Sequence, residues 1–169
     1  MGSPDGYKNG EFSTYTVREG LSNEVILSLF EDSTGNIWIG TDGGGADLLN
    51  NGKFTVYSTK NGLAANSVYC FAEDPSGGMW IGTDGGVSRL QNGRFQTYST
   101  ANGLPSAKVR ALYWDRDGGL WVGTNGGGLA REKNGSFTTF TTHDGLSSNA
   151  VFSICSDEDA NLWIGTIGG

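Results

Sequence analysis

The sequence predicts a single all-β domain built from four tandem copies of one small antiparallel sheet. Four tryptophans, Trp38, Trp80, Trp121 and Trp163, follow one another at spacings of 42, 41 and 42 residues. Glycine accounts for 29 of the 169 residues and proline for only three, which suits short strands joined by tight turns. Each copy contains four short stretches with strand character, separated by turn residues. Four strands at this period are typical of one blade of a β-propeller.

Other residue types keep the same offset from tryptophan in every copy. The recurring positions are Phe12, Phe54, Phe95 and Phe137; Leu21, Leu63, Leu104 and Leu146; and Asp32, Asp74, Asp115 and Asp157. We therefore expect one repeat domain over residues 1–169, with repeats at approximately 3–44, 45–86, 87–127 and 128–169. The second copy is one residue short, and we place the missing residue in its glycine run at 83–87.

The order of strands within a blade follows from their polarity. The first stretch of each copy, such as 26–31, is apolar on both alternating faces and is expected at the centre, covered on both sides. The second (37–41) and third (46–49) follow across turns rich in Asp, Asn and Gly. An Asn-Gly turn then leads into a stretch such as 54–58, which alternates aromatic and polar residues and suits the outer edge.

The ends of the sequence fall inside one blade. Residues 3–7 align with the third strand of a copy, and residues 162–166 with the second. We expect the N-terminal third and fourth strands to pair with the C-terminal first and second strands, which would remove open sheet edges. Pro4 weakens this third strand, although an edge position tolerates it.

This pairing is possible within one chain, which gives four blades, or between two chains, which gives an eight-bladed homodimer. We favour the homodimer, because exchange of termini is a low-cost route to a dimer.

Composition excludes several function classes. The formal charge is −7 and lysines and arginines form no cluster, so a nucleic-acid partner is not expected. No apolar run approaches the roughly 20 residues of a membrane-spanning helix, and no charged-then-apolar stretch resembles a signal peptide. Met1-Gly2-Ser3 resembles the start of an expressed fragment. Cys70 and Cys155 occupy different repeat positions, so we expect two buried thiols and no disulfide.

The residues for catalysis or metal binding are scarce. With one histidine, His143, and two separate cysteines, no metal cluster or Cys/His pair can be assembled, and we expect no cofactor and no enzymatic activity. The acid pairs Asp115/Asp117 and Asp157/Asp159 offer calcium ligands, but their place between the first two strands of a blade favours a turn role.

The repeated tryptophans allow two interpretations. They offer rigid faces for carbohydrate stacking, but their fixed place in the second strand favours packing within the blade. Trp114 breaks the pattern, because the other copies have Glu31, Glu73 and Ser156 there.

Recognition is expected where the copies differ, on the links from each outer strand to the next inner strand. The candidate ligand-binding residues on these links are Arg18, Glu24, Lys60, Asn66, His143 and Asn149. They favour a binding or sensing module for a small molecule. The alternative is an excised or engineered four-blade fragment that acts as a self-assembling scaffold with no ligand of its own.

Two motifs carry a resemblance to a known family. The run Gly-Asn-Ile-Trp-Ile-Gly-Thr-Asp-Gly-Gly-Gly (35–45) and the run Asp-Gly-Leu-Ser-Ser-Asn-Ala-Val (144–151) resemble the two-component regulator propeller repeat, and the likeness covers nearly the whole chain. The resemblance implies the extracytoplasmic, periplasmic sensor region of bacterial hybrid two-component regulators. It also implies an extracellular signal, with glycan fragments among the candidate ligands.

Overall fold

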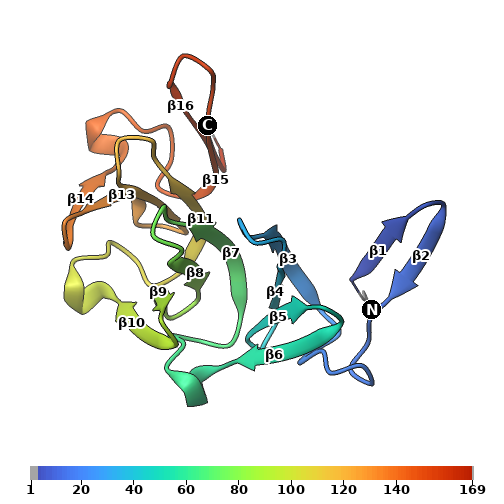
Figure 1. The fold of residues 1–169 in the computed structure, drawn as a ribbon. Coiled ribbons are helices and arrows are strands. Elements are labelled where there is room, and N and C mark those ends of the chain that lie inside the picture. Colours follow the sequence, from blue (N-terminus) through green and yellow to red (C-terminus); the bar gives the residue numbers. More distant parts are fainter. Residues whose placement is uncertain (1–3, 169) are drawn as a thin grey trace.

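The computed structural model describes residues 4–168 as an arc of small antiparallel sheets (Figure 1). Three sheets are complete blades. They comprise β3 (Ile26–Glu31), β4 (Ile37–Thr41), β5 (Ala46–Asn50) and β6 (Lys53–Tyr57); β7 (Val68–Glu73), β8 (Met79–Thr83), β9 (Gly86–Gln91) and β10 (Arg94–Tyr98); and β11 (Val109–Trp114), β12 (Leu120–Thr124), β13 (Gly128–Lys133) and β14 (Ser136–Phe140). Two half-blades flank them, formed by β1 (Asp5–Lys8) with β2 (Glu11–Thr14) and by β15 (Val151–Ser156) with β16 (Leu162–Thr166). The all-β, four-stranded blade is confirmed.

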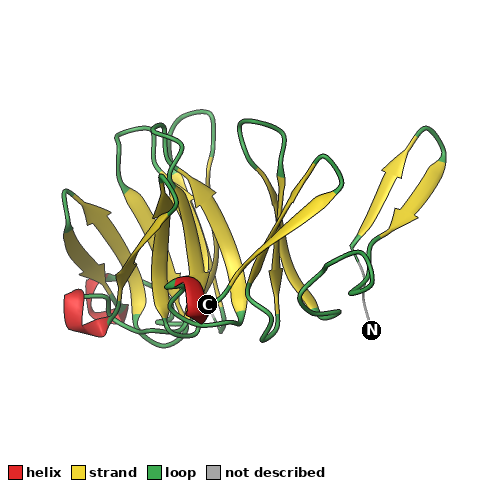
Figure 2. Cartoon of the chain, turned by 60° about the horizontal axis from the view of Figure 1, so that its bottom comes forward, coloured by secondary structure: helices red, strands yellow, loops and turns green. Residues whose placement is uncertain are grey.

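Each complete blade runs in chain order from its inner to its outer strand. The inner strands β3, β7, β11 and β15 lie next to one another, and β6, β10 and β14 form the rim (Figure 1). At the centre of the arc, β7 and β11 consist of buried and half-buried residues, whereas β3 and β15 are mostly half-buried or exposed because a half-blade or no blade covers them. The links between blades lie on the same face as the glycine turns between the second and third strands, and the other hairpin turns lie on the opposite face (Figure 2).

The short glycine turn of the second blade explains its missing residue. Thr41 Oγ1 donates to the carbonyl of Gly45, four residues on, at 2.9 Å. Thr83 Oγ1 makes the same bond at 2.9 Å to Gly86, only three residues on. Gly86 has φ +128° and a Cβ there would collide with the carbonyl of Tyr98, so only glycine fits. The placement of the missing residue in this run is confirmed.

The recurring aspartate and tryptophan are tied to each other in every copy. The indole Nε1 of Trp38, Trp80, Trp121 and Trp163 donates to the carboxylate of Asp32, Asp74, Asp115 and Asp157 at 3.0, 2.9, 3.2 and 2.8 Å. Trp38 and Trp80 also stack on an aromatic residue of the rim, with ring centroids 5.6 Å apart in each case. The same carboxylates accept backbone N–H groups of the turn between the first two strands. These contacts support the packing interpretation of the tryptophans.

The core lies between neighbouring blades. Trp38 and Trp80 are only 5% and 3% exposed because the next blade covers them, whereas Trp163 is 61% exposed on its half-blade. Trp114, the residue that breaks the repeat, is half-buried with its ring centroid 6.2 Å from that of Trp80. It therefore fills the interface between the second and third blades.

The two half-blades do not pair with each other in this structure. They lie apart, at the two ends of the arc (Figures 1 and 2). The predicted third strand at 3–7 is found as β1 at Asp5–Lys8, and residue 3 lies outside the described residues. Closure of the ring therefore stays a prediction.

The cysteines differ from expectation in one respect. Cys70 and Cys155 are free thiols, and Cys70 is half-buried, but Cys155 is exposed. The prediction that both are buried is wrong for Cys155, because no further blade covers β15. Among residues 4–168, no helix is long and apolar enough to cross a membrane.

Candidate functional site

The links between blades each contain one short, strongly capped turn. Three of these turns are 3-10 helices, η1 (Thr59–Asn61), η2 (Thr100–Asn102) and η3 (Thr142–Asp144). A Ser or Thr caps each helix, the third helical residue bonds back to the cap, and a left-handed glycine ends it. The turns lie at the rim of the arc (Figure 1). They carry two of the candidate residues, Lys60 and His143.

Two other candidates, Asn66 and Asn149, connect the links to the glycine turns. The Asn66 side-chain oxygen accepts the N–H of Thr59 at 2.8 Å, and its carbonyl accepts the N–H groups of Gly43 and Gly45 at 3.1 and 2.8 Å. Asn149 makes the equivalent three bonds at 2.9, 2.9 and 2.8 Å. The link that follows the blade with the shorter glycine turn has Ala107 at this position. The two asparagines therefore brace adjoining blades, a role that the sequence analysis missed.

The six candidate residues do not lie together. Arg18, Lys60 and His143 are exposed on the first, second and fourth links, and the short helices that carry Lys60 and His143 lie at the rim. Glu24, the counterpart of Asn66 in the first copy, is half-buried. The links place these residues at separate points around the arc.

A β-bulge recurs in the inner strand of every copy. The register between the first two strands shifts once in each sheet, around Leu27, Tyr69, Arg110 and Phe152. A bulged residue has no partner across the ladder, so its side chain is re-aimed. The four copies carry four different side chains at this position, whereas the residues around it are similar.

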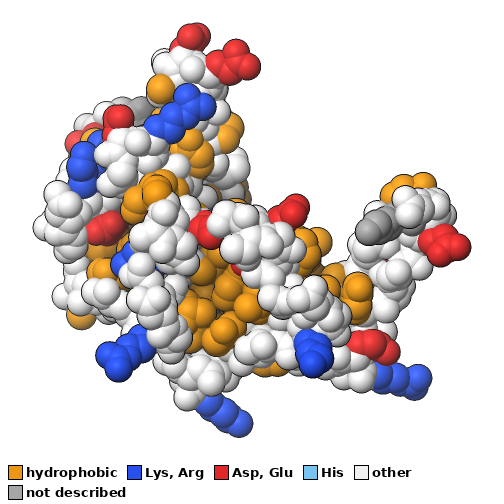
Figure 3. Space-filling view, in the orientation of Figure 1, with side chains coloured by type: hydrophobic (Ala, Val, Ile, Leu, Met, Phe, Trp, Pro, Cys, Tyr) orange, Lys and Arg blue, Asp and Glu red, His pale blue; other side chains and the backbone are white. Residues whose placement is uncertain are grey.

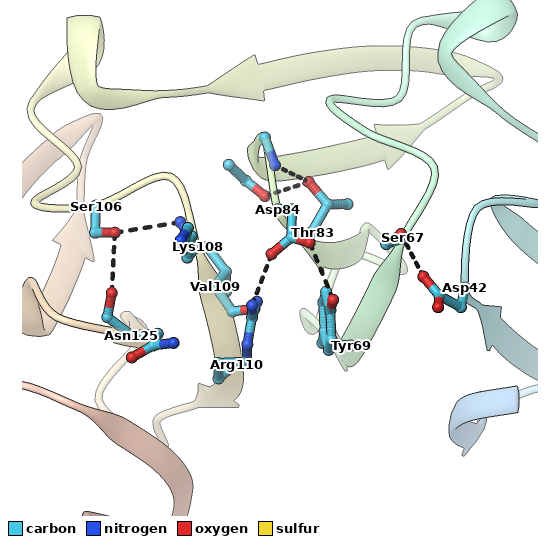
Figure 4. A network of polar contacts seen from close by, with 12 residues as sticks. Asp42, Ser67, Tyr69, Thr83, Asp84, Ser106, Lys108, Val109, Arg110 and Asn125 are labelled. Atoms are coloured by element: carbon cyan, nitrogen blue, oxygen red, sulfur yellow. Dashed lines mark hydrogen bonds and ion pairs between the residues drawn. The ribbon is translucent and has the colours of Figure 1, made fainter.

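The bulged residues of the second and third blades meet in one polar network (Figure 4). The Tyr69 hydroxyl donates to Asp84 at 3.0 Å, and Arg110 forms an ion pair of 2.7 Å with the same carboxylate. The Arg110 guanidinium lies over the Tyr69 ring, 3.7 Å from its centroid, which is a close cation–π contact. Next to this network, Ser67 donates to Asp42 at 2.8 Å. We call Asp42, Ser67, Tyr69, Asp84 and Arg110 the inner-strand network.

The inner-strand network is partly shielded from water. The Arg110 side chain is 13% exposed and that of Asp84 is 40% exposed, so the ion pair is open on the carboxylate side. Burial, the hydrogen bond to Asp84 and the charge of Asp84 raise the pKa of Tyr69, so the phenol stays a donor at neutral pH. Burial raises the pKa of the neighbouring Cys70 thiol strongly, which leaves it a poor nucleophile. The site is therefore suited to polar recognition.

The aspartates that could offer calcium ligands form hydrogen bonds within their own blades. Asp115 and Asp157 accept from their tryptophans and from turn N–H groups. Among the described residues, no group of three or more histidines, cysteines or acids is placed to hold a metal ion. The turn interpretation of these residues is therefore favoured by their contacts.

The sequence analysis missed the inner-strand network although a signal for it was present. Asp42, Asp84, Asn125 and Ile167 occupy one repeat position directly after the second strand, and Leu27, Tyr69, Arg110 and Phe152 another. Both positions vary in charge and size while their neighbours are constant. Variation between copies identifies these positions, but the bulge that brings them together appears only in the structure.

Comparison with known proteins gives the chain a family. The model of the two component regulator propeller matches residues 20–43, 62–85, 103–126 and 145–168. The chain belongs to this family. Each match in this regulator propeller covers the link, the inner strand and the tryptophan strand of one copy, so the repeat resemblance is confirmed.

Solved structures similar to this regulator propeller include two of an extracellular domain. The domain of the putative one component system BT4673 from B. thetaiotaomicron is 25% identical, with a TM-score of 0.72 over 86% of this chain and 22% of that chain. A second structure, described as from the putative hybrid two component system BT4673, has 22% identity and a TM-score of 0.77 over 95% of this chain and 24% of that chain. The regulator propeller thus spans less than a quarter of these relatives.

A third similar structure shows the fold alone. Virginiamycin B lyase from Staphylococcus aureus is 20% identical, with a TM-score of 0.74 over 94% of this chain and 54% of the lyase. No curated protein sequence matches the regulator propeller.

Proposed function

We propose that this regulator propeller is a non-enzymatic binding and sensing module, and that its ligand contacts the inner-strand network. One observation carries the proposal: Tyr69, Asp84 and Arg110, from two blades, form a partly shielded cluster at bulged or turn positions that vary between copies. Such variable polar residues on a constant scaffold are typical of recognition sites. The family and the extracellular relatives support a sensing role outside the cytoplasm.

The chemistry of the inner-strand network favours a small polar ligand rich in hydroxyl groups, because the Asp84 carboxylate is the more exposed partner of its ion pair. Arg110 offers planar N–H donors and Tyr69 offers both a ring face and a hydroxyl. Lys108, which is exposed and lies two residues before Arg110, adds a second positive charge. A glycan fragment offers the hydroxyl groups that these residues recognise.

Titration calorimetry tests this proposal with neutral oligosaccharides and their uronic-acid counterparts. We expect heat of binding from one of these two kinds of oligosaccharide and at least about a tenfold loss of affinity in Arg110→Gln, because a hydrogen bond to a charged group contributes roughly 1.5–3 kcal/mol. Arg116→Gln is the matched control, because exposed Arg116 lies in the turn between β11 and β12, beyond the other end of β11 from Arg110. Absence of heat with every oligosaccharide would remove the glycan ligand.

The link residues provide a second contact set to test in the same assay. If ligand binds at the rim, Lys60→Ala and His143→Ala will weaken binding while Arg110→Gln will not. The opposite pattern is expected if the inner-strand network is the site.

A second candidate function is a self-assembling scaffold with no ligand of its own. The exposed aromatic residues of both half-blades favour it, because Tyr7, Phe12 and Trp163 are 66, 74 and 61% exposed. Assembly combined with no binding in the calorimetric screen would support the scaffold over the sensor.

A further inference from the structure

An unfilled apolar hollow separates the N-terminal half-blade from the first complete blade. Its volume is about 430 Å³, and its lining includes Pro4, Tyr15, Leu29, Ile39 and Leu49. Leu29 is 57% exposed there, although it belongs to an inner strand. Figure 3 shows hydrophobic side chains uncovered where the β1–β2 hairpin joins the rest of the molecule.

A second hollow lies at the other end of the arc, between the third blade and the C-terminal half-blade. It measures about 300 Å³ and is lined by Trp121, Leu129, Phe140, Leu162 and Ile164, among others. Both hollows therefore adjoin a half-blade, and both are lined mainly by apolar side chains.

The contact between the first two complete blades shows what the first hollow lacks. There Trp38 is packed with Phe71, Ile81 and Leu90 of the next blade. One repeat earlier, these three positions are Leu29, Ile39 and Leu49, which line the first hollow, and the position of Trp38 is that of Trp163. The side chain that completes this hollow is thus a tryptophan on β16.

The second hollow lacks the aromatic residues of the N-terminal hairpin. Between complete blades, the rim aromatics make T-shaped contacts, Tyr57 with Phe95 and Tyr98 with Phe137, each at 5.8 Å. By the same offset, Phe140 is left to contact Phe12. Tyr7 of β1 takes the position of Leu90 in the core between blades.

A polar pair supports the same match across the two ends. In the first copy the N–H of Ser22 donates to Asp47 at 2.8 Å, and in the second the N–H of Ala64 donates to Ser88 at 2.9 Å. The third copy has lost both groups together, with Pro105 and Ala130 in these places. The divided blade retains both, an N–H on Ser147 and a carboxylate on Asp5.

The backbone register also accommodates Pro4. Ile39 faces Asp47 and Gly40 faces Ala46 across β4 and β5, which places Ile164 opposite Asp5 and Gly165 opposite Pro4. Thr41 and Gly45 form a hydrogen-bonded pair, since Thr41 N donates to Gly45 at 3.1 Å, so the adjacent pair, Gly40 and Ala46, is a non-hydrogen-bonded one. The N–H that Pro4 lacks would therefore point toward β2, and β16 would lose no bond.

We propose that β15–β16 of one chain completes a blade with β1–β2 of a second copy, and that the reciprocal contact closes an eight-bladed ring. The partner is a second copy because the half-blades of one chain lie apart while the packing between the complete blades is already in place (Figures 1 and 2). The two identical contacts are related by a twofold axis, so the assembly is closed. The inference does not depend on a ligand at the inner-strand network.

Light scattering on the 169-residue chain tests the proposal through its mass. We expect twice the chain mass of 17.8 kDa. Trp163→Arg should give the mass of one chain with an unchanged far-ultraviolet spectrum, because Trp163 is exposed in the isolated chain. The control Val56→Arg changes an exposed apolar residue of the complete first blade and should remain a dimer. A single-chain mass for the unaltered protein, or a dimeric Trp163→Arg, would overturn the proposal.

A disulfide across the new strand pair identifies which ends meet. Asp5→Cys and Ile164→Cys are introduced together in a Cys155→Ser background and oxidised. A bond between two chains, seen as a doubled mass without reductant, is the expected result. A bond formed within one chain would show a four-bladed ring, and no bond between these positions would show a different contact; either result contradicts the proposal.

Discussion

The strongest test of how a blade is held together is the change Asp74→Asn. The carboxylate of Asp74 is 3% exposed and accepts from Trp80 Nε1 at 2.9 Å, Arg89 Nε at 2.8 Å and the N–H of Gly78 at 3.0 Å. An amide in its place presents an N–H group to one of two sets of donors, either Trp80 and Arg89 or Ser76 and Gly78, because different carboxylate oxygens accept from the two sets. We expect a loss of about 3 kcal/mol in the free energy of unfolding, since breaking bonds to a buried charge costs roughly 1.5–5 kcal/mol.

The effect of Asp74→Asn should depend on pH. Burial alone would raise the pKa of Asp74, but the hydrogen bonds from Ser76, Gly78, Arg89 and Trp80 outweigh it and lower the pKa. A lowered folded-state pKa gives stability that is present above the unfolded pKa, near about 3.9, and is lost as the pH falls through the folded pKa. The difference between the two proteins should therefore be full at pH 7 and shrink in acid.

Urea unfolding followed by circular dichroism measures this difference. Asp117→Asn, an exposed aspartate in a turn of the same kind, is the matched control and should change stability little. Asp157→Asn, in the exposed half-blade, should cost less than Asp74→Asn. If Asp74→Asn costs no more than Asp117→Asn, the carboxylate does not hold the blade.

Three further changes test other positions, each by urea unfolding. Asp47→Ser introduces the residue of the second copy at a position where a fully buried carboxylate has one oxygen without a hydrogen bond. Burial raises the pKa of Asp47, so we expect the free energy of unfolding to increase by about 1 kcal/mol, more at pH 7 than at pH 4. A decrease in this free energy at pH 7 would contradict the reasoning. Gly86→Ala should cost more than twice as much as Gly77→Ala, because both have positive φ, worth about 1–2 kcal/mol, but only Gly86 would collide with backbone; equal costs would refute the reasoning. Asn66→Ala should cost about 1 kcal/mol by removing the side-chain bond to the N–H of Thr59, and no loss would show that this bond is dispensable.

Much of the fold follows from the sequence because residues that hold a blade together recur at constant spacings in every copy. The spacing from Asp74 to Trp80 is constant because the two side chains form a hydrogen bond. The second copy is one residue short because Thr83 bonds to Gly86, three residues on, where the other complete blades have a bond to the fourth residue. The ends were harder to predict. Strand patterns show that β1 and β16 are compatible, but the angle between neighbouring blades arises from packing, which a local pattern does not contain.

The candidate site was predictable only in part. Asn66 looked like a variable loop residue, yet its carbonyl makes two of its three bonds, and a backbone role leaves little trace in side-chain patterns. Tyr69 and Arg110 were visible as differences between copies. Their meeting at Asp84 depends on two bulges and on the contact between blades, neither of which a sequence encodes locally.

The bulge of the inner strand has a consequence for how such propellers diversify. A residue released from ladder pairing carries no constraint on strand pairing, so leucine, tyrosine, arginine and phenylalanine are all accommodated there. The hydrogen bond between aspartate and tryptophan lies several residues away and does not involve the bulged residue. Single substitutions at this position can therefore change the charge and size of the bulged side chain in each copy, without changing the hydrogen bonds that hold the blade together.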